Sequence, residues 1–175
     1  LPGEIDFNFR IKTEHSEDYI LKISRPNENE NYLDFQQQLI AYINQNDENA
    51  IAPKVIKDNN KNAISSIVDK QGNKRFVRLL TWISGRLWSQ VNPQLNDLRY
   101  SLGKQCGLLT KALQGFFHNE ARRELDWDTA QSLWTKEYLN LFAENEKEIL
   151  EYFQNEFDAS QQDYSQLRKS VIHND

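Results

Sequence analysis

Lys22 is the basic residue whose position best suits contact with a bound anion. It lies beside Ile20, Leu21 and Ile23, in an apolar run that reads as a buried strand. The simplest interpretation of a strand lysine is a solvent-facing member of an alternating pattern. Lys22, however, follows a strand and a loop and precedes a helix with acidic residues, an order that can hold nucleotide phosphates against a lysine ammonium. We therefore interpret Lys22 as a candidate phosphate-binding residue.

A lysine in this role needs an acidic neighbour, and the segment after Pro26 contains three candidates. Asp34 lies within the predicted helix and is the first choice, with Glu28 and Glu30 as competitors. All three are equally explained as acidic residues of a solvated first helical turn, where the helix dipole favours negative charge.

A His-x-Asp sequence, His173-Asn174-Asp175, follows the apolar pair Val171-Ile172. A histidine two residues before an aspartate at the end of a strand is typical of a phosphoryl-transfer catalytic loop. There the aspartate accepts or orients the proton of a substrate hydroxyl, while the histidine packs below it and fixes the loop. The tripeptide also occurs by chance in many proteins. Its position after a hairpin, a linker and long helices is what favours the catalytic-loop interpretation.

Other candidate sites are weaker. Gly3 would let the backbone approach a phosphate closely, although a plain turn is the simpler explanation of one glycine. The histidines His15, His118 and His173 have no cysteine or paired acid at metal-ligand spacing, so we predict no metal-binding residues in this sequence. Neither a Gly-x-Ser-x-Gly elbow nor a Walker-type phosphate loop is present, which argues against a hydrolase and a P-loop nucleotidase.

The elements that would position these residues begin with a sheet. Ile5, Phe7, Phe9 and Ile11 alternate with polar residues, which predicts a half-buried strand. The elements predicted after it are a strand over 19–23, a helix over about 32–45, and a hairpin with strands over 64–68 and 76–83.

Beyond Ser84-Gly85 the pattern becomes helical. Two long segments, 95–117 and 127–157, have helical periodicity and few turn formers. The sequence therefore predicts an α+β protein in which a sheet-rich part, 1–83, precedes a helical part, 84–175.

Composition excludes several classes of protein. The 175 residues carry a net charge of −5, and their 21 lysines and arginines form no basic stripe, so we expect no nucleic acid partner. There is no apolar run of bilayer length and no signal-peptide core, so we expect a cytoplasmic protein without a membrane partner. The absence of methionine and the end within an expected strand and loop predict that this sequence is a piece of a longer chain.

Four ordered blocks of this sequence resemble the aminoglycoside phosphotransferase-like kinases. The blocks are Leu1-Pro2-Gly3-Glu4-Ile5-Asp6-Phe7-Asn8-Phe9, Tyr19-Ile20-Leu21-Lys22-Ile23, Val77-Arg78-Leu79-Leu80-Thr81-Trp82-Ile83-Ser84-Gly85 and Val171-Ile172-His173-Asn174-Asp175. The similarity continues through 115–118 and 127–128 and so covers essentially the whole chain. Within that family the blocks resemble most the hydroxylysine kinase-like and homoserine kinase-like subgroup, which includes versions fused to a class III aminotransferase.

The resemblance implies a protein-kinase-like two-lobe fold, here truncated. Residues 1–83 would form an antiparallel-sheet N-lobe with one helix, which binds nucleotide. Residues 84–175 would form the first, mainly helical part of the substrate lobe and end at the catalytic loop. Further C-terminal domains would be fused in some relatives.

For the nucleotide, the resemblance implies that Lys22 binds ATP phosphates and that Asp34 pairs with it, although Asp34 is shorter than the usual glutamate. Gly3 and Asn8 belong to the block that would cover the phosphates. Leu80 would be the gatekeeper, and the hinge that meets adenine through backbone groups would be Thr81, Trp82 and Ile83.

For catalysis, the resemblance implies that Asp175 is the base and that His173 fixes its loop. The asparagine and aspartate that hold magnesium in this family would follow Asp175. The 175 residues alone are therefore expected to be inactive.

The leading hypothesis is phosphorylation, with ATP and Mg, of a hydroxyl on a small, amine-bearing metabolite such as an amino alcohol or aminoglycoside-like compound. The alternative is a non-catalytic pseudokinase module that binds nucleotide or a partner domain in a larger fusion protein. A purely structural helical domain is the third hypothesis, and it leaves the coincidence of Lys22 with His173 and Asp175 unexplained. Intact metal ligands after Asp175 would favour the enzyme over the binding module.

Overall fold

The computed structural model describes residues 5–122, 125 and 128–172. The chain divides into two compact units, Leu1–Ala121 with Ser170–Asp175, and Arg122–Lys169. This division by contacts does not test the lobe boundary after residue 83, which stays a prediction.

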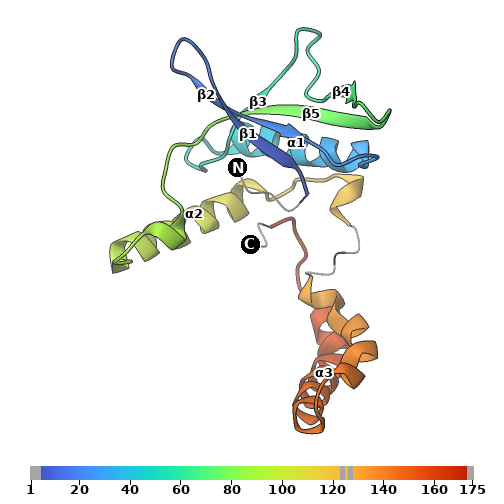
Figure 1. Cartoon of the computed structure of the whole chain (residues 1–175). Helices are drawn as coiled ribbons and strands as arrows, with labels where there is room; N and C mark the ends of the chain where they lie inside the picture. Colours follow the sequence, from blue (N-terminus) through green and yellow to red (C-terminus); the bar gives the residue numbers. More distant parts are fainter. Residues whose placement is uncertain (1–4, 123–124, 126–127, 173–175) are drawn as a thin grey trace. The chain divides into compact units, whose positions relative to one another are not determined.

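The first unit is built on a five-stranded antiparallel sheet (Figure 1). The strands are β1 (Phe7–Lys12), β2 (Asp18–Ile23), β3 (Val55–Ile56), β4 (Ser65–Val68) and β5 (Lys74–Thr81). β5 pairs with β2 along one edge and with both β3 and β4 along the other. The predicted β1, β2 and β4–β5 hairpin are confirmed. β3 was not predicted, because two residues are too few to show a period.

The burial of β1 differs from the prediction. Its apolar side chains are exposed, with Phe7 56% and Phe9 49% exposed, and Asn8 is the one residue of the strand that is half-buried. The register explains the difference, because Asn8 lies opposite Lys22, which in turn lies opposite Arg78 on β5. The covered face of the sheet thus carries a polar row across three strands.

Helix α1 (Glu30–Asn46) lies along this face of the sheet (Figure 1). It begins at Asn29, whose side chain accepts a hydrogen bond from the Asn31 N–H at 2.9 Å, as an N-cap does. Leu33, Gln37 and Ile43 are its buried residues and recur at helical spacing. The predicted helix is confirmed, with one additional turn divided between its two ends.

A second helix, α2 (Asn96–Ala112), confirms most of the helix predicted over 95–117. Its end packs with α1 in a core of Ile43, Ala50, Ala112 and Leu113. Val171 packs against the same core, and neither Val171 nor Ile172 is part of a strand, in contrast to the prediction. Two short 3-10 helices, η1 (Trp88–Gln90) and η2 (Asn119–Ala121), lie before and after α2.

The second unit contains the 3-10 helix η3 (Thr129–Leu141) and helix α3 (Glu144–Ser165). Lys136 pairs with Asp158 at 2.8 Å, and Gln154 donates to Thr135 at 2.9 Å, which joins the two helices. A continuous helix over 127–157 is therefore wrong. The backbone is extended at Phe142 and Ala143, and α3 starts anew where the Glu146 carboxylate accepts from the Ala143 N–H. In the described part of the chain, no helix has the length and apolar character needed to cross a membrane.

The β4–β5 turn is closed by the carboxylate of Asp69. It accepts hydrogen bonds from Arg75 Nε at 2.7 Å and from the backbone N–H groups of Asn73 and Gln71. Gly72 adopts φ +84° in this turn, a conformation that favours glycine. The Arg75 guanidinium, followed by the Asn73 N–H, lowers the pKa of Asp69 from 3.8 to about 2.

We predict that Asp69→Asn lowers the free energy of unfolding at neutral pH and that this difference shrinks as the pH falls from about 4 to about 2. The folded chain binds the Asp69 proton less readily than the unfolded chain, so the contribution is complete above the unfolded pKa and is lost as the pH falls through the folded pKa. Urea denaturation of wild type and variant across this range measures it. A difference that does not vary with pH would contradict the assignment.

Candidate functional site

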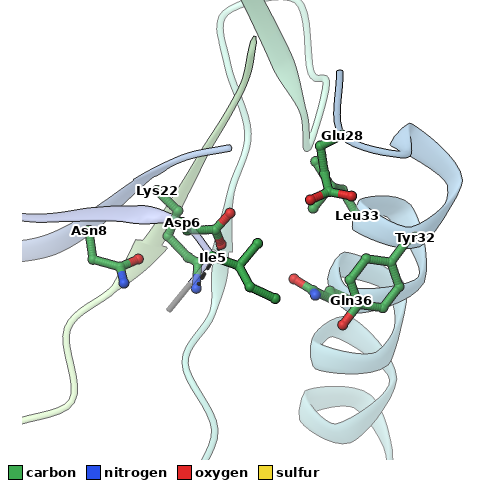
Figure 2. Close-up of a pocket in the computed structure, with 8 residues that line it drawn as sticks. All are labelled: Ile5, Asp6, Asn8, Lys22, Glu28, Tyr32, Leu33 and Gln36. Carbon is green, nitrogen blue, oxygen red and sulfur yellow. Dashed lines mark ion pairs between the residues drawn. The ribbon is translucent and has the colours of Figure 1, made fainter. Parts of the chain in front are cut away.

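A cavity of about 300 Å³ lies between the sheet and the first turns of α1. On the sheet side Figure 2 shows Ile5, Asp6, Asn8 and Lys22, and facing them Glu28, Tyr32, Leu33 and Gln36. The first unit alone provides all of these residues. Two residues predicted to bind nucleotide, Lys22 and Asn8, therefore lie together in one cavity.

The ammonium of Lys22 is held by the carboxylate of Asp6, with Nζ 3.1 Å from Oδ2. The same oxygen accepts a hydrogen bond at 2.5 Å from the guanidinium of Arg78. Lys22 and Arg78 are directly opposite each other on β2 and β5, so their side chains lie on the same face of the sheet. One carboxylate oxygen thus bridges two cations.

Arg78 is buried to a degree that is rare for an arginine. Its side chain is 0% exposed, while that of Asp6 is 10% exposed and that of Lys22 is 27% exposed. A second guanidinium nitrogen donates to Gln36 Oε1 of α1 at 2.5 Å. The exposed fraction of the side chain therefore increases from Arg78 through Asp6 to Lys22, and of the two cations it is Lys22 that lines the cavity.

The acidic residue on the helix side is Glu28, but another cation already holds it. Its carboxylate accepts from Arg25 Nε at 2.7 Å and from the Asn29 N–H at 2.9 Å. Glu30, the other competitor, pairs with Lys74 at 3.4 Å. The residues of α1 that line the cavity, Tyr32, Leu33 and Gln36, are all neutral.

The structure does not bring Asp34 to Lys22. Its carboxylate accepts from Gln38 Nε2 at 2.5 Å and lies 3.5 Å from His118 Nε2. The helical period is the reason: Leu33 and Gln37 face the sheet, and Asp34 is turned about 100° away from Leu33. The pairing of Lys22 that the structure shows is with Asp6, a residue that sequence analysis did not single out.

The predicted hinge continues from β5. Leu80 is buried, and Thr81 donates its N–H to the Lys54 carbonyl at 2.9 Å while its hydroxyl accepts from the Lys54 N–H at 2.8 Å. The Trp82 N–H donates to the Asp18 carbonyl at 3.0 Å, and Arg10 lies 4.3 Å over the Trp82 ring. The N–H groups of Thr81 and Trp82 are thus already used within the sheet.

Three predicted residues, Gly3, His173 and Asp175, lie outside the described residues. Among the described residues no group of three or more histidines, cysteines, aspartates or glutamates could hold a metal ion. What the described residues do place at the wall of the cavity is a partly exposed ammonium fixed by a carboxylate.

Arg78, Asp6 and Gln36 are the site residues that sequence analysis missed. A signal for Arg78 existed, because it stands between Phe76 and Leu80 on the inward side of a strand, where an apolar residue is expected. Asp6 and Gln36 carried no such signal, since both stand in polar positions of ordinary patterns.

The solved structure titled "Amicoumacin kinase hAmiN in complex with AMP-PNP, Ca2+ and Ami" is similar to this chain, with a TM-score of 0.65 and 20% sequence identity. The match covers 100% of this chain and 49% of that protein, so the chain spans about half the length of the kinase it resembles. It shows that the antiparallel sheet and the helices form a kinase-like fold, as the sequence predicted. A search of curated proteins gave no significant match.

The family assignment comes from the sequence as a whole. The sequence model of the phosphotransferase enzyme family matches residues 1–175, and the fold and the lysine-bearing cavity agree with that match. The chain belongs to the phosphotransferase enzyme family.

Proposed function

We propose that the whole protein transfers the γ-phosphoryl group of ATP to a hydroxyl of a small molecule. The observation that carries this proposal is the Lys22 ammonium, fixed by Asp6 and facing a cavity between the sheet and α1 of a phosphotransferase-family chain. A lysine so placed can neutralise phosphate charge while a nucleotide is held in line for transfer.

The cavity residues fit the phosphate end of a nucleotide. Lys22 has three N–H donors, of which Asp6 takes one, so the others can contact phosphate oxygens. A volume of about 300 Å³ is near the lower limit of small-molecule pockets, which suits part of a nucleotide. When bound, ATP would supply the transferable phosphoryl group, and the residues of this chain would hold and orient it.

Adenine would lie at the strand end beyond Leu80. Since the Thr81 and Trp82 N–H groups are bonded to Lys54 and Asp18, we propose that backbone recognition uses Ile83 or the carbonyl groups of this segment. Leu80 keeps its role as gatekeeper in this proposal. Thr81 has a structural role there, because its hydroxyl caps the Lys54 N–H.

We propose that Asp175 orients the substrate hydroxyl and accepts its proton, and that His173 fixes the loop. The residues that would hold magnesium are proposed to follow Asp175, because the described residues contain no cluster of metal ligands. Intact metal ligands there would favour the enzyme over the pseudokinase alternative, which would bind nucleotide without transferring phosphate.

The substrate we propose is a small, amine-bearing alcohol. The similar solved structure is that of a kinase with a small-molecule substrate in its title, which supports this size class. Asp128 is an acidic residue that could attract an amine, but its carboxylate accepts from the Ala130 N–H at 3.0 Å as the N-cap of η3. We therefore propose no role for Asp128 in substrate binding.

We predict that Lys22→Ala weakens ATP binding to the whole protein by roughly tenfold or more, the size expected for a charged hydrogen bond to phosphate. The fold should remain intact, because Asp6 keeps its bond to Arg78. Calorimetric titration with ATP and adenosine measures the effect. Lys12→Ala, an exposed lysine of β1, is the matched control and should bind ATP as wild type does. Equal ATP affinity of wild type and Lys22→Ala would refute the phosphate assignment.

We predict that Asp175→Asn leaves ATP affinity nearly unchanged and lowers kcat of the whole protein by orders of magnitude. The amide keeps the size of the side chain but cannot accept the hydroxyl proton. Single-turnover phosphate transfer to a panel of amino alcohols and aminoglycosides measures kcat apart from binding. Wild-type turnover in the variant would exclude Asp175 as the base.

A further inference from the structure

We infer that Asp6, anchored by Arg78, is the positioning residue that orients Lys22 toward the phosphates. This inference rests on the proposed function and names the acidic partner of its central lysine. The partner comes from the segment before β1, and no acid of α1 contributes it.

The anchor is the buried guanidinium. Arg78 is fully buried, and a buried cation needs an anion within hydrogen-bond distance. Asp6 is its ionic partner at 2.5 Å, and Gln36 of the helix accepts a second hydrogen bond from the guanidinium. Asp6 is therefore held in place whether or not a ligand lies in the cavity.

The need for an orienting carboxylate follows from the register. Lys22 and Arg78 are a directly opposed pair on neighbouring strands, where two positive charges repel each other. Without Asp6 the ammonium would lose its fixed position whichever residue stands at 78, since its four-carbon stem is flexible and no other acid among the described residues contacts it. The 3.1 Å contact with Asp6 holds the ammonium at the cavity wall.

The helix does not take this role, although it borders the same cavity. The α1 side chains that line it, Tyr32, Leu33 and Gln36, are all neutral, and Gln36 is bonded to Arg78. Asp34 points to Gln38 and His118, and Glu28 is engaged by Arg25. Asp6 is the acid that contacts Lys22 in the described part of the chain.

The test must separate orientation of Lys22 from neutralisation of Arg78. Asp6→Asn alone removes the only ionic partner that the described residues give Arg78, so it is expected to lower the urea midpoint. A loss of ATP affinity in this variant could then come from either the orientation of Lys22 or the stability of the fold. The informative protein is the double variant Asp6→Asn/Arg78→Met. It removes one negative and one positive charge, so the net charge around Lys22 is unchanged, and an apolar side chain of similar length fills the buried site.

We expect the double variant of the whole protein to have a urea midpoint near that of wild type and an unchanged affinity for adenosine. Its ATP affinity should fall by about tenfold, the effect of a displaced charged donor. Adding Lys22→Ala to the double variant should weaken ATP binding no further, because the lysine is already misplaced. Asp69→Asn, which removes the carboxylate of another partly buried pair in this sheet, is the control and should leave ATP affinity unchanged.

A folded double variant that binds ATP as wild type does would overturn the inference and leave Asp6 with a purely structural role. If the double variant does not fold, Asp6→Glu makes the same distinction, since it keeps a negative charge for Arg78 but moves the carboxylate by one methylene. Wild-type ATP affinity in Asp6→Glu would then overturn it. The proposed function fails separately, if wild type shows no preference for ATP over adenosine or Lys22→Ala has no effect on that preference.

Discussion

The burial of one arginine is the constraint on which the first unit depends. Arg78 stands in the middle of β5 with no side-chain exposure, so the fold must supply an anion and further hydrogen-bond partners there. Asp6 and Gln36 meet this need from two different segments, one before β1 and one in α1. The same arrangement brings the strand segment and the helix together on either side of the cavity that contains Lys22.

This constraint also explains the face that β1 turns outward. A strand with alternating apolar residues is expected to cover the core with them. Here the inner face is already occupied by the polar row Asn8, Lys22 and Arg78, so Phe7 and Phe9 are left on the outer face. On that outer face the Phe7 ring is contacted by the guanidinium of Arg75, 5.6 Å from its centroid.

Periodicity predicted most elements of the sheet and α1, because each is long enough to repeat its pattern and is bounded by a turn. It did not predict β3, because this strand has two residues and is defined by its pairing with β5. It also missed the break at Phe142-Ala143, because the apolar residues keep their helical spacing through that point. For the site, Lys22 and Asn8 were predicted and lie in the cavity. The ionic partner of Lys22 was not predicted. Asp34 does not reach Lys22, because its face of α1 is turned away from the sheet, and the acid that does, Asp6, lies just before β1 begins.

The order of the strands determines when the three charged residues Asp6, Lys22 and Arg78 can come together. β2 is joined to β1 by a short turn, but its other edge is completed by β5, which comes from much later in the sequence. A growing chain therefore contains Asp6 and Lys22 well before Arg78 is made. Arg78 arrives with the strand that closes the sheet, so closure of the sheet and burial of the second cation are a single event. A chain that paired β5 out of register would have to bury this charge without its anion, which is costly.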